Sequence, residues 1–249
     1  MARTVADLKL LFEVLQGSDD GDPSSAPVRL RWPDKLKKVR IGFFEDDGRT
    51  PVTGETRAAV RSAAEGLRRA GFEVESFRPE GLEKIRELWW KLFGIAGGML
   101  LRPMFKGREQ DMSPTLKQYL GWVASEPAHT GQSLLDTWVE SDLVRLSMLA
   151  QLHDYPILLC PVAAIPAFRH GERSWMVEDR QVQYLDAWSY TEWFNLLGMP
   201  AAVVPVGKSP EGLPIGVQIA GLPWDEELVL EIAGAVETQC QGWQRPPES

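Results

Sequence analysis

The chain has 249 residues, of which 44% are hydrophobic and 25% charged, a composition typical of a globular protein that buries a core. Its net charge of -8 repels nucleic-acid backbones, and its short basic clusters (35–38 and 68–69) are too small to form a basic face. We therefore exclude nucleic acid as a partner. Two cysteines are too few for a disulfide framework, and charged residues interrupt the N-terminal apolar run that a secretory signal needs. These features predict a cytoplasmic protein.

The first predicted element is a helix over residues 1–17. Its apolar residues recur at i, i+3, i+4 and i+7, namely Leu8, Leu11, Phe12 and Leu15. Thr4 stands where an N-cap is expected, and Gly17 stands where the helix should end. The Asp, Gly, Pro and Ser residues of 18–27 then predict an exposed loop.

A βαβ unit follows this loop. Residues 38–45 form a short apolar run typical of a buried strand, and Thr53 is the expected N-cap of a helix over 55–70. A second strand is predicted at 72–77. Two strands joined by a helix of this length should be parallel, so we expect helices to cover the faces of their sheet.

The pattern of residues 80–155 is mostly helical, with breaks expected at Pro103, at 112–114 and at 125–131. The longest apolar run, 92–101, has about half the ~20 residues of a membrane span. A buried core helix is the favoured interpretation of this run, while contact with a membrane surface or an apolar pocket stays open.

The last third of the chain returns to an alternation of strands and helices. Its predicted elements are a strand at 155–161, an irregular segment to about 180, a helix at 184–198, strands at 201–207 and 214–221, and a closing helix at 225–240. No clean linker divides the chain, so we predict a single α/β domain over residues 1–249.

A catalytic triad is not favoured by the positions of the histidines. His153 neighbours Asp154, but adjacent helical residues point about 100° apart and cannot act as a base and its orienting group. His129 and His170 lie in loops, and no Gly-x-Ser-x-Gly turn presents a serine to either.

Cys160 deserves separate consideration because it ends a predicted strand, where open α/β sheets place their sites. A buried free thiol is the commoner explanation, and nothing in the sequence supplies a base for it, yet a thiolate nucleophile stays open. No metal-ligand spacing and no phosphate-loop order of glycines occurs, so we predict neither a metal nor a cofactor.

Aromatic residues gather between 175 and 194. Trp188, Trp193 and Phe194 lie just before a strand, as the aromatic wall of a ligand pocket would. Core packing is an equal alternative, since helical spacing sends the two tryptophans to different faces. We expect one of them to face a cavity, and we select Trp188, Trp193, Phe194 and Cys160 as candidate pocket residues.

Three stretches of the sequence carry a resemblance to a known family. "MARTVADLKLLFEVLQGSD" resembles a segment of the amidase signature family that follows its catalytic region, and "PILLCPV" resembles a later strand. "NLLGMPAAVVPVG", "EGLPIGVQIAG" and "DEELVLEIAGAVE" are similar to the family's C-terminal end. The stretch "IGFFEDDGRTPVTGETRAAV" is similar to the βαβ portion of members that include fatty acid amide hydrolase. The resemblance implies a carboxamide hydrolase with a mixed β-sheet covered by helices on both faces.

The resemblance also implies a catalytic lysine and two serines that lie before the first of these stretches. No position matches them, and the pair Ser24 and Ser25 lacks the surrounding glycines, so we assign no catalytic residue. We expect the C-terminal half of an amidase domain, inactive alone, that supplies scaffold and pocket walls for an amide substrate. The missing half or self-association should cover its exposed surfaces. The alternative is a non-catalytic binding or subunit module for an apolar ligand.

Overall fold

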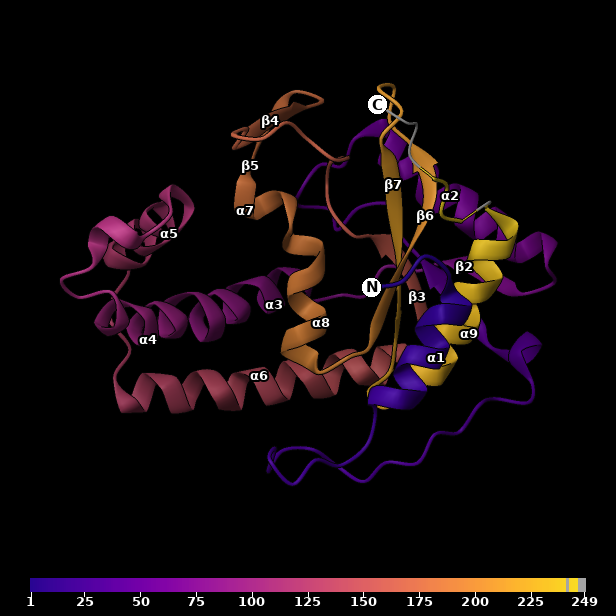
Figure 1. Cartoon of the computed structure of the whole chain (residues 1–249), viewed down its shortest axis with the longest axis horizontal. Coiled ribbons are helices and arrows are strands. Elements are labelled where there is room, and N and C mark those ends of the chain that lie inside the picture. The colour runs from indigo at the N-terminus through magenta and orange to yellow at the C-terminus, as the bar shows by residue number, and fades with distance from the viewer. Residues whose placement is uncertain (241, 246–249) are drawn as a thin grey trace. The chain divides into compact units, whose positions relative to one another are not determined.

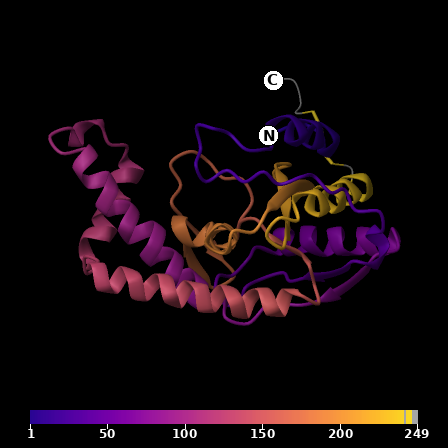
Figure 2. The same ribbon diagram turned by 90° about the horizontal axis from the view of Figure 1, so that it is seen from below.

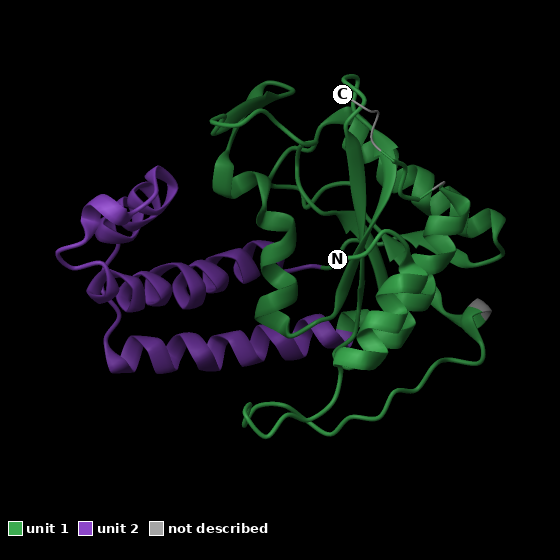
Figure 3. Cartoon of the chain, viewed as in Figure 1, with its two compact units in different colours: residues 1–79, 151–249 green, residues 80–150 purple. Residues whose placement is uncertain are grey.

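The computed structural model describes residues 1–240 and 242–245, and its contacts group these residues into two compact units (Figure 1, Figure 3). Unit 1 combines residues 1–79 with the described residues after 150, and unit 2 comprises residues 80–150. The single domain predicted from the sequence stays a prediction.

Unit 1 contains a mixed sheet of five strands in the order β2-β1-β3-β7-β6. These strands are β1 (Arg40–Phe43), β2 (Glu73–Ser76), β3 (Ile157–Pro161), β6 (Ala201–Lys208) and β7 (Pro214–Gly221). β1 runs parallel to β2 and to β3, whereas β7 is antiparallel to β3 and to β6. The predicted βαβ unit and mixed sheet are therefore confirmed.

Alternation along β3 divides the sheet into two faces. Ile157 and Leu159 belong to the main hydrophobic cluster, which also contains residues of α2 (Gly54–Arg69) and α9 (Glu226–Gln239). Leu158 and Cys160 are also buried. Because they alternate with Ile157 and Leu159 along the strand, their side chains point to the opposite face of the sheet. The segment that contains Tyr190 lies over this second face, because the Gln218 side chain of β7 bonds its carbonyl. Helical segments thus cover both faces.

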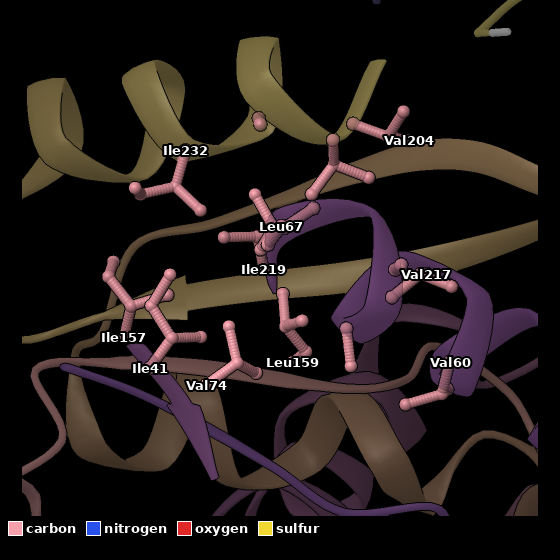
Figure 4. Packing of buried hydrophobic residues seen from close by; sticks show 14 of the residues in the cluster. Ile41, Val60, Leu67, Val74, Ile157, Leu159, Val204, Val217, Ile219 and Ile232 are labelled. Atoms are coloured by element: carbon pink, nitrogen blue, oxygen red, sulfur yellow. The ribbon is translucent and has the colours of Figure 1, made fainter. Parts of the chain in front are cut away.

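The main cluster joins strands and helices that are distant in the sequence. Figure 4 shows Ile41, Ile157 and Ile219 from three strands gathered with Leu67 of α2 and Ile232 of α9. The predicted amphipathic stripe of α2 produces this contact, since its Ala59, Val60, Ala63 and Leu67 side chains are all buried. Apolar burial is the main stabilising contribution of such a core.

The N-terminal helix α1 (Val5–Leu15) forms as predicted, with the Thr4 side chain accepting a hydrogen bond from the Asp7 N–H. Gly17 follows the end of the helix at a φ of 127°, a conformation that glycine adopts without steric cost. α1 packs on α9, and the Glu237 carboxylate accepts the hydrogen bond of the Val5 N–H. This contact satisfies one of the free donors at the start of α1.

Two sequence expectations in unit 1 differ from the structure. The expected irregular segment contains a hairpin, β4 (Ser174–Val177) and β5 (Arg180–Gln183). The expected helix over 184–198 is divided into α7 (Tyr184–Ala187), a 3-10 turn η4 (Ser189–Thr191) and α8 (Glu192–Leu197). The side chains of Trp193 and Gln218 donate hydrogen bonds to the Tyr190 carbonyl and stabilise the interrupted helix. Local periodicity does not reveal these bonds.

Unit 2 is helical, as predicted. Its elements are α3 (Leu82–Trp89), a π-helix η2 (Trp90–Ile95), α4 (Ala96–Met104), a short 3-10 turn η3 (Glu109–Asp111), α5 (Pro114–Ser125) and α6 (Gly131–Leu152), whose last two residues belong to unit 1. The ion pair of Lys84 with Glu140, at 2.6 Å, joins α3 to α6. Gly98 is required where α4 meets α5, because a Cβ there would lie 2.6 Å from the Val123 side chain.

The apolar run 92–101 differs from a fully buried core helix. It lies in η2 and α4, where Ile95 and Gly98 are buried while Leu100 is 74% exposed. Within residues 1–240 and 242–245, no helix has the combination of length and apolar character that is needed to cross a membrane.

Replacing Ile219 with Ala should lower the free energy of unfolding by about 2–5 kcal/mol, because the fully buried side chain leaves a cavity at the centre of the main cluster. Urea denaturation followed by circular dichroism measures the change. Val203→Ala on the edge strand β6, where the side chain is 45% exposed, is the control and should cost roughly 1 kcal/mol or less. Equal losses for the two variants would contradict the assigned core.

Candidate functional site

The carboxyl ends of β1 and β3 lie side by side, because the strands are parallel with Gly42 opposite Leu158. Sites of open α/β sheets occur in the crevice beyond such ends. The loop after β1 is joined to the segment after β3 by the Thr53 N–H, which donates to the Ala164 carbonyl at 2.9 Å. The Ala164 N–H in turn donates to the Ala187 carbonyl at 2.8 Å. Three chain segments therefore converge here.

A buried hydrogen-bond network centres on the Tyr190 carbonyl. The Gln218 Nε2 donates to it at 3.1 Å and lies 3.4 Å from the Cys160 Sγ across the β3–β7 pair. The Trp193 indole Nε1 also donates to it, at 3.1 Å. Both lone pairs of one carbonyl are thereby used, which holds the η4 turn against the sheet.

The Tyr190 hydroxyl extends this network to the loop after β1. It donates to the Thr50 carbonyl at 2.8 Å and accepts the hydrogen bond of the Asp47 N–H at 3.1 Å. The Asp47 carboxylate lies 3.2 Å away. Burial, together with the neighbouring negative charge, raises the pKa of Tyr190 above its ordinary value, so the group stays a neutral phenol that positions the loop.

A second aromatic group lies further out, on the segment before the hairpin, on β4, and on α7 with the residue that follows it. Its members, which we name the outer aromatic cluster, are Phe168, Trp175, Tyr184 and Trp188. The Phe168 ring centroid lies 4.7 Å from that of Trp175 and 6.1 Å from that of Trp188. Such a group of rings forms an apolar wall with polar edges.

The two candidate tryptophans differ in their hydrogen bonding. The Trp193 indole is 4% exposed, and its N–H is satisfied by the Tyr190 carbonyl. Trp188 is half-buried, and its buried Nε1 has no acceptor among the residues that the structure describes. An unsatisfied buried donor is costly unless a ligand or water supplies the acceptor. Trp188 is therefore the candidate placed to donate to a bound molecule.

Phe194 and Cys160 lie deeper than Trp188. Phe194 is 4% exposed, and its ring centroid is 4.0 Å from that of Trp193. Cys160 is fully buried. The network thus brings Cys160 and Trp193 together through Gln218 and the Tyr190 carbonyl, whereas Trp188 belongs to the outer aromatic cluster. The pocket role of all four residues stays a prediction.

Charged residues surround the convergent loops. Arg57 of α2 pairs with Glu178 in the hairpin turn at 3.2 Å and with Asp46 after β1 at 3.8 Å. Glu45 pairs with Arg61 of the same helix. These ion pairs tie the hairpin and the β1 loop to α2, although such partly exposed pairs each contribute little to stability.

Neither histidine chemistry nor thiolate chemistry is assembled around Cys160. Burial raises the pKa of the Cys160 thiol to about 12, so it is protonated at neutral pH, and no hydrogen bond within residues 1–240 and 242–245 joins it to a histidine. His153 and His170 are exposed. The thiolate alternative therefore has neither a base nor a lowered pKa.

One contact between a histidine and a serine was not expected from the sequence. The His129 Nδ1 lies 3.2 Å from the Ser133 Oγ, and its Nε2 donates to the Lys91 carbonyl at 3.0 Å. Ser133 and Thr130 also exchange backbone-to-side-chain bonds at the start of α6. This exchange is a capping box, so the contact has a structural role at the helix start.

A groove of about 510 Å³ lies between α1, α9 and the end of α2. Its walls include Val5, Leu36 and Phe72, and the ion pair of Lys9 with Glu231 at 2.5 Å also lines it. None of the candidate pocket residues lines this groove. No cluster of three or more His, Cys, Asp or Glu side chains suited to a metal ion is found in the described part of the chain.

A model of the amidase family matches residues 1–230. The chain belongs to the amidase family. Indoleacetamide hydrolase of Bradyrhizobium diazoefficiens is 26% identical to it over 247 residues, which cover 96% of this chain and 45% of that protein. The predicted resemblance to the amidase signature family is confirmed, and relatives such as indoleacetamide hydrolase are hydrolases of carbon–nitrogen bonds.

Solved structures of amidases share the fold. A chain from a vestigial protein complex, described for the evolutionary origins of an s-triazine catabolic enzyme, is 25% identical with a TM-score of 0.82 over 98% of this chain and 53% of that chain. Fatty acid amide hydrolase is 20% identical, with a TM-score of 0.76 over 96% of this chain and 47% of that chain. This amidase chain thus spans about half the length of the proteins it matches.

Replacing Tyr190 with Phe should lower the free energy of unfolding by about 1–3 kcal/mol, because the Thr50 carbonyl and the Asp47 N–H lose their buried partner. Chemical denaturation measures this loss. Tyr184→Phe, in the half-buried outer aromatic cluster, is the matched control and should change stability by less than about 0.5 kcal/mol. A Tyr190→Phe variant with an unchanged free energy of unfolding would contradict the positioning role of the hydroxyl.

Native protein treated with iodoacetamide at pH 8 should leave Cys160 unmodified, because its raised pKa and full burial keep the thiol neutral and inaccessible. Half-buried Cys240 should react first, and both thiols should react in urea. Peptide mass spectrometry distinguishes the two sites. Rapid modification of Cys160 in the folded chain would restore the thiolate alternative.

Proposed function

We propose that this chain is the scaffold and acyl-pocket half of an amide hydrolase, and that it is inactive without a catalytic half. One observation carries the proposal: the family match covers residues 1–230, yet no position corresponds to the lysine and two serines implied by the family resemblance. The chain spans about half the length of its relatives, which supports the same conclusion.

In the complete enzyme, a serine of the catalytic half attacks the amide carbonyl, the amine or ammonia leaves, and water hydrolyses the acyl-enzyme. Residues 1–249 contribute no group to these bond changes. Their role is to hold the acyl part of the substrate beside the carboxyl ends of β1 and β3, where the chain's converging loops lie.

The outer aromatic cluster supplies the wall of this acyl pocket. The Trp188 Nε1, a buried donor without an acceptor in the described structure, binds a polar group of the substrate. Trp193, Phe194 and Cys160 support the wall from the buried side. The aromatic lining suits an amide with an aromatic or apolar acyl group, in keeping with the name of the relative indoleacetamide hydrolase.

The catalytic half has two surfaces of unit 1 on which to dock. β6 is the last strand of the sheet, and no described strand pairs with its outer edge. α1 exposes Leu10, Val14 and Leu15, each by more than 60%. An open strand edge and an exposed apolar helix face are the features that a completing half covers.

A non-catalytic subunit is the second candidate function. It is favoured by the relative that belongs to a vestigial protein complex, since that chain is matched over 98% of the present one. In this case the outer aromatic cluster would bind an apolar ligand or remain unused, and no complementing half would restore hydrolysis.

Fluorophosphonate treatment of the purified chain should give no serine adduct by intact-mass analysis, and the chain alone should not hydrolyse aromatic amides such as indole-3-acetamide. Co-expression with a polypeptide that carries the lysine and two serines of the family should produce both an adduct on that partner and amide hydrolysis. A stoichiometric adduct on residues 1–249 would overturn the proposal, and a labelled, active partner that gains nothing from this chain would favour the non-catalytic subunit.

Trp188→Phe in the reconstituted enzyme should raise the KM for amides with a polar acyl substituent by about 2–10-fold, the loss expected for one neutral hydrogen bond. The matched control is Trp175→Phe, whose indole N–H is already bonded to Glu172. Unchanged KM values in the Trp188 variant would contradict its assignment as the substrate donor.

A further inference from the structure

The β4–β5 hairpin is a small sheet of its own. In the described part of the chain, its two strands pair with each other and with none of the five strands of the main sheet. Trp175 lies opposite Val182, and Val177 lies on the same face of β4 as Trp175. Both valines are only 2% exposed, so this face is turned inward. A two-stranded hairpin is marginally stable by itself, and contacts outside it therefore determine its position.

The inward face of the hairpin carries one ring of the outer aromatic cluster. Trp175 is half-buried, and its ring centroid lies 4.7 Å from that of Phe168. The other three rings of the cluster lie outside β4 and β5. A movement of the hairpin would therefore shift Trp175 relative to the rest of the aromatic wall.

The turn of the hairpin contains a glutamate in an unfavourable backbone conformation. Glu178 has a φ of 56°, in the left-handed region where a residue with a Cβ is sterically disfavoured and glycine is not. Its side chain is 57% exposed, so burial does not explain why a glutamate stands there. Such an outlier points to a role for the side chain itself.

The Glu178 side chain binds Arg57 in the first turn of α2. The Arg57 Nη1 lies 3.2 Å from the Glu178 Oε1, and the Arg57 Nη2 lies 3.8 Å from the Asp46 Oδ2 in the loop after β1. The Arg57 Nε is buried and has no acceptor among the described residues, so these two carboxylates orient the guanidinium. Because its planar fork presents two nitrogens at once, one arginine joins the hairpin turn to the loop after β1. We name this contact of three residues the Arg57 bridge.

The loop end of the Arg57 bridge is itself held in place. The Asp46 Oδ1 accepts the hydrogen bond of the Gly48 N–H at 2.9 Å, and the Arg78 Nη1 lies 3.6 Å from the same oxygen. This loop is also bonded to the segment after β3, beside the carboxyl ends of β1 and β3. The bridge therefore attaches a marginally stable hairpin to the part of unit 1 where the chain's loops converge.

We propose that Arg57 is a positioning residue of the acyl pocket: by pairing with Glu178 it holds the β4–β5 hairpin against the loop after β1, and so fixes Trp175 in the aromatic wall. The role of the wall rests on the proposed function, whereas the bridge can be tested on this chain alone. Amides with an aromatic acyl group depend most on the bridge, because a small acyl group buries little surface against the wall.

Hydrogen exchange of the hairpin amides in the full chain, followed by mass spectrometry, tests the bridge. Glu178→Gln keeps the shape of the side chain and removes its charge. It should raise the exchange rate of residues 174–183 by about 2–5-fold, as expected for the loss of a partly exposed ion pair. Raising the NaCl concentration from about 0.05 M to about 1 M should give a similar increase in the wild-type chain and none in the variant.

The matched control is Glu65→Gln, since Glu65 pairs with Arg68 on the same helix and its side chain is 58% exposed. This substitution should leave the exchange of the hairpin unchanged. In an Arg57→Gln chain, Glu178→Gln should have no further effect, because the two residues act through one interaction. An undiminished effect of Glu178→Gln in that chain, or a wild-type hairpin whose exchange does not respond to salt, would overturn the bridge.

Kinetics of the reconstituted enzyme test the positioning role. Arg57→Gln should raise the KM for indole-3-acetamide by about 2–5-fold and the KM for acetamide by less, and the loss should appear in KM rather than in kcat. Arg57→Lys, which keeps the charge, should recover part of the loss. An active enzyme in which Arg57→Gln changes both KM values equally would overturn the positioning role and leave the proposed function intact. A serine adduct on this chain alone would refute the proposed function without altering the exchange results.

Discussion

The structure of unit 1 depends on the complete burial of one short strand. All five residues of β3 are buried, and the strand pairs in parallel with β1 and antiparallel with β7. Ile157 and Leu159 enter the main hydrophobic cluster, whereas Cys160 lies beneath the candidate site. A shift of one residue in register would exchange these two faces. The same constraint therefore determines both the core and the floor of the site.

The Tyr190 carbonyl connects this sheet to the aromatic residues. Because Gln218 and Trp193 both donate to it, the chain between Trp188 and Trp193 forms a tight turn instead of a continuous helix. The turn directs Trp193 into the interior and leaves Trp188 with the outer aromatic cluster. The Tyr190 carbonyl accepts the Trp193 N–H, which gives Trp193 a structural role, whereas the Trp188 N–H stays available as a candidate donor to a ligand.

Membership of the amidase family and the local geometry support different parts of the functional argument. The family match and the shared fold establish the scaffold. Cys160 is a buried thiol whose pKa is raised by burial, and Ser133 has a capping role, so neither residue is placed as a nucleophile. The proposed docking of a catalytic half depends on the open edge of β6 and the exposed apolar side chains of α1.

The sequence by itself determined the features that depend on local patterns: the helix that begins after Thr53, the apolar strands, and the family to which the chain belongs. Only the tertiary structure decided which tryptophan N–H has an acceptor. The Trp193 N–H reaches the Tyr190 carbonyl because the helix is interrupted there, and Gln218 donates to the same carbonyl from a distant strand. The hairpin at 174–183 was also missed, since cross-strand pairing stabilises strands of four residues.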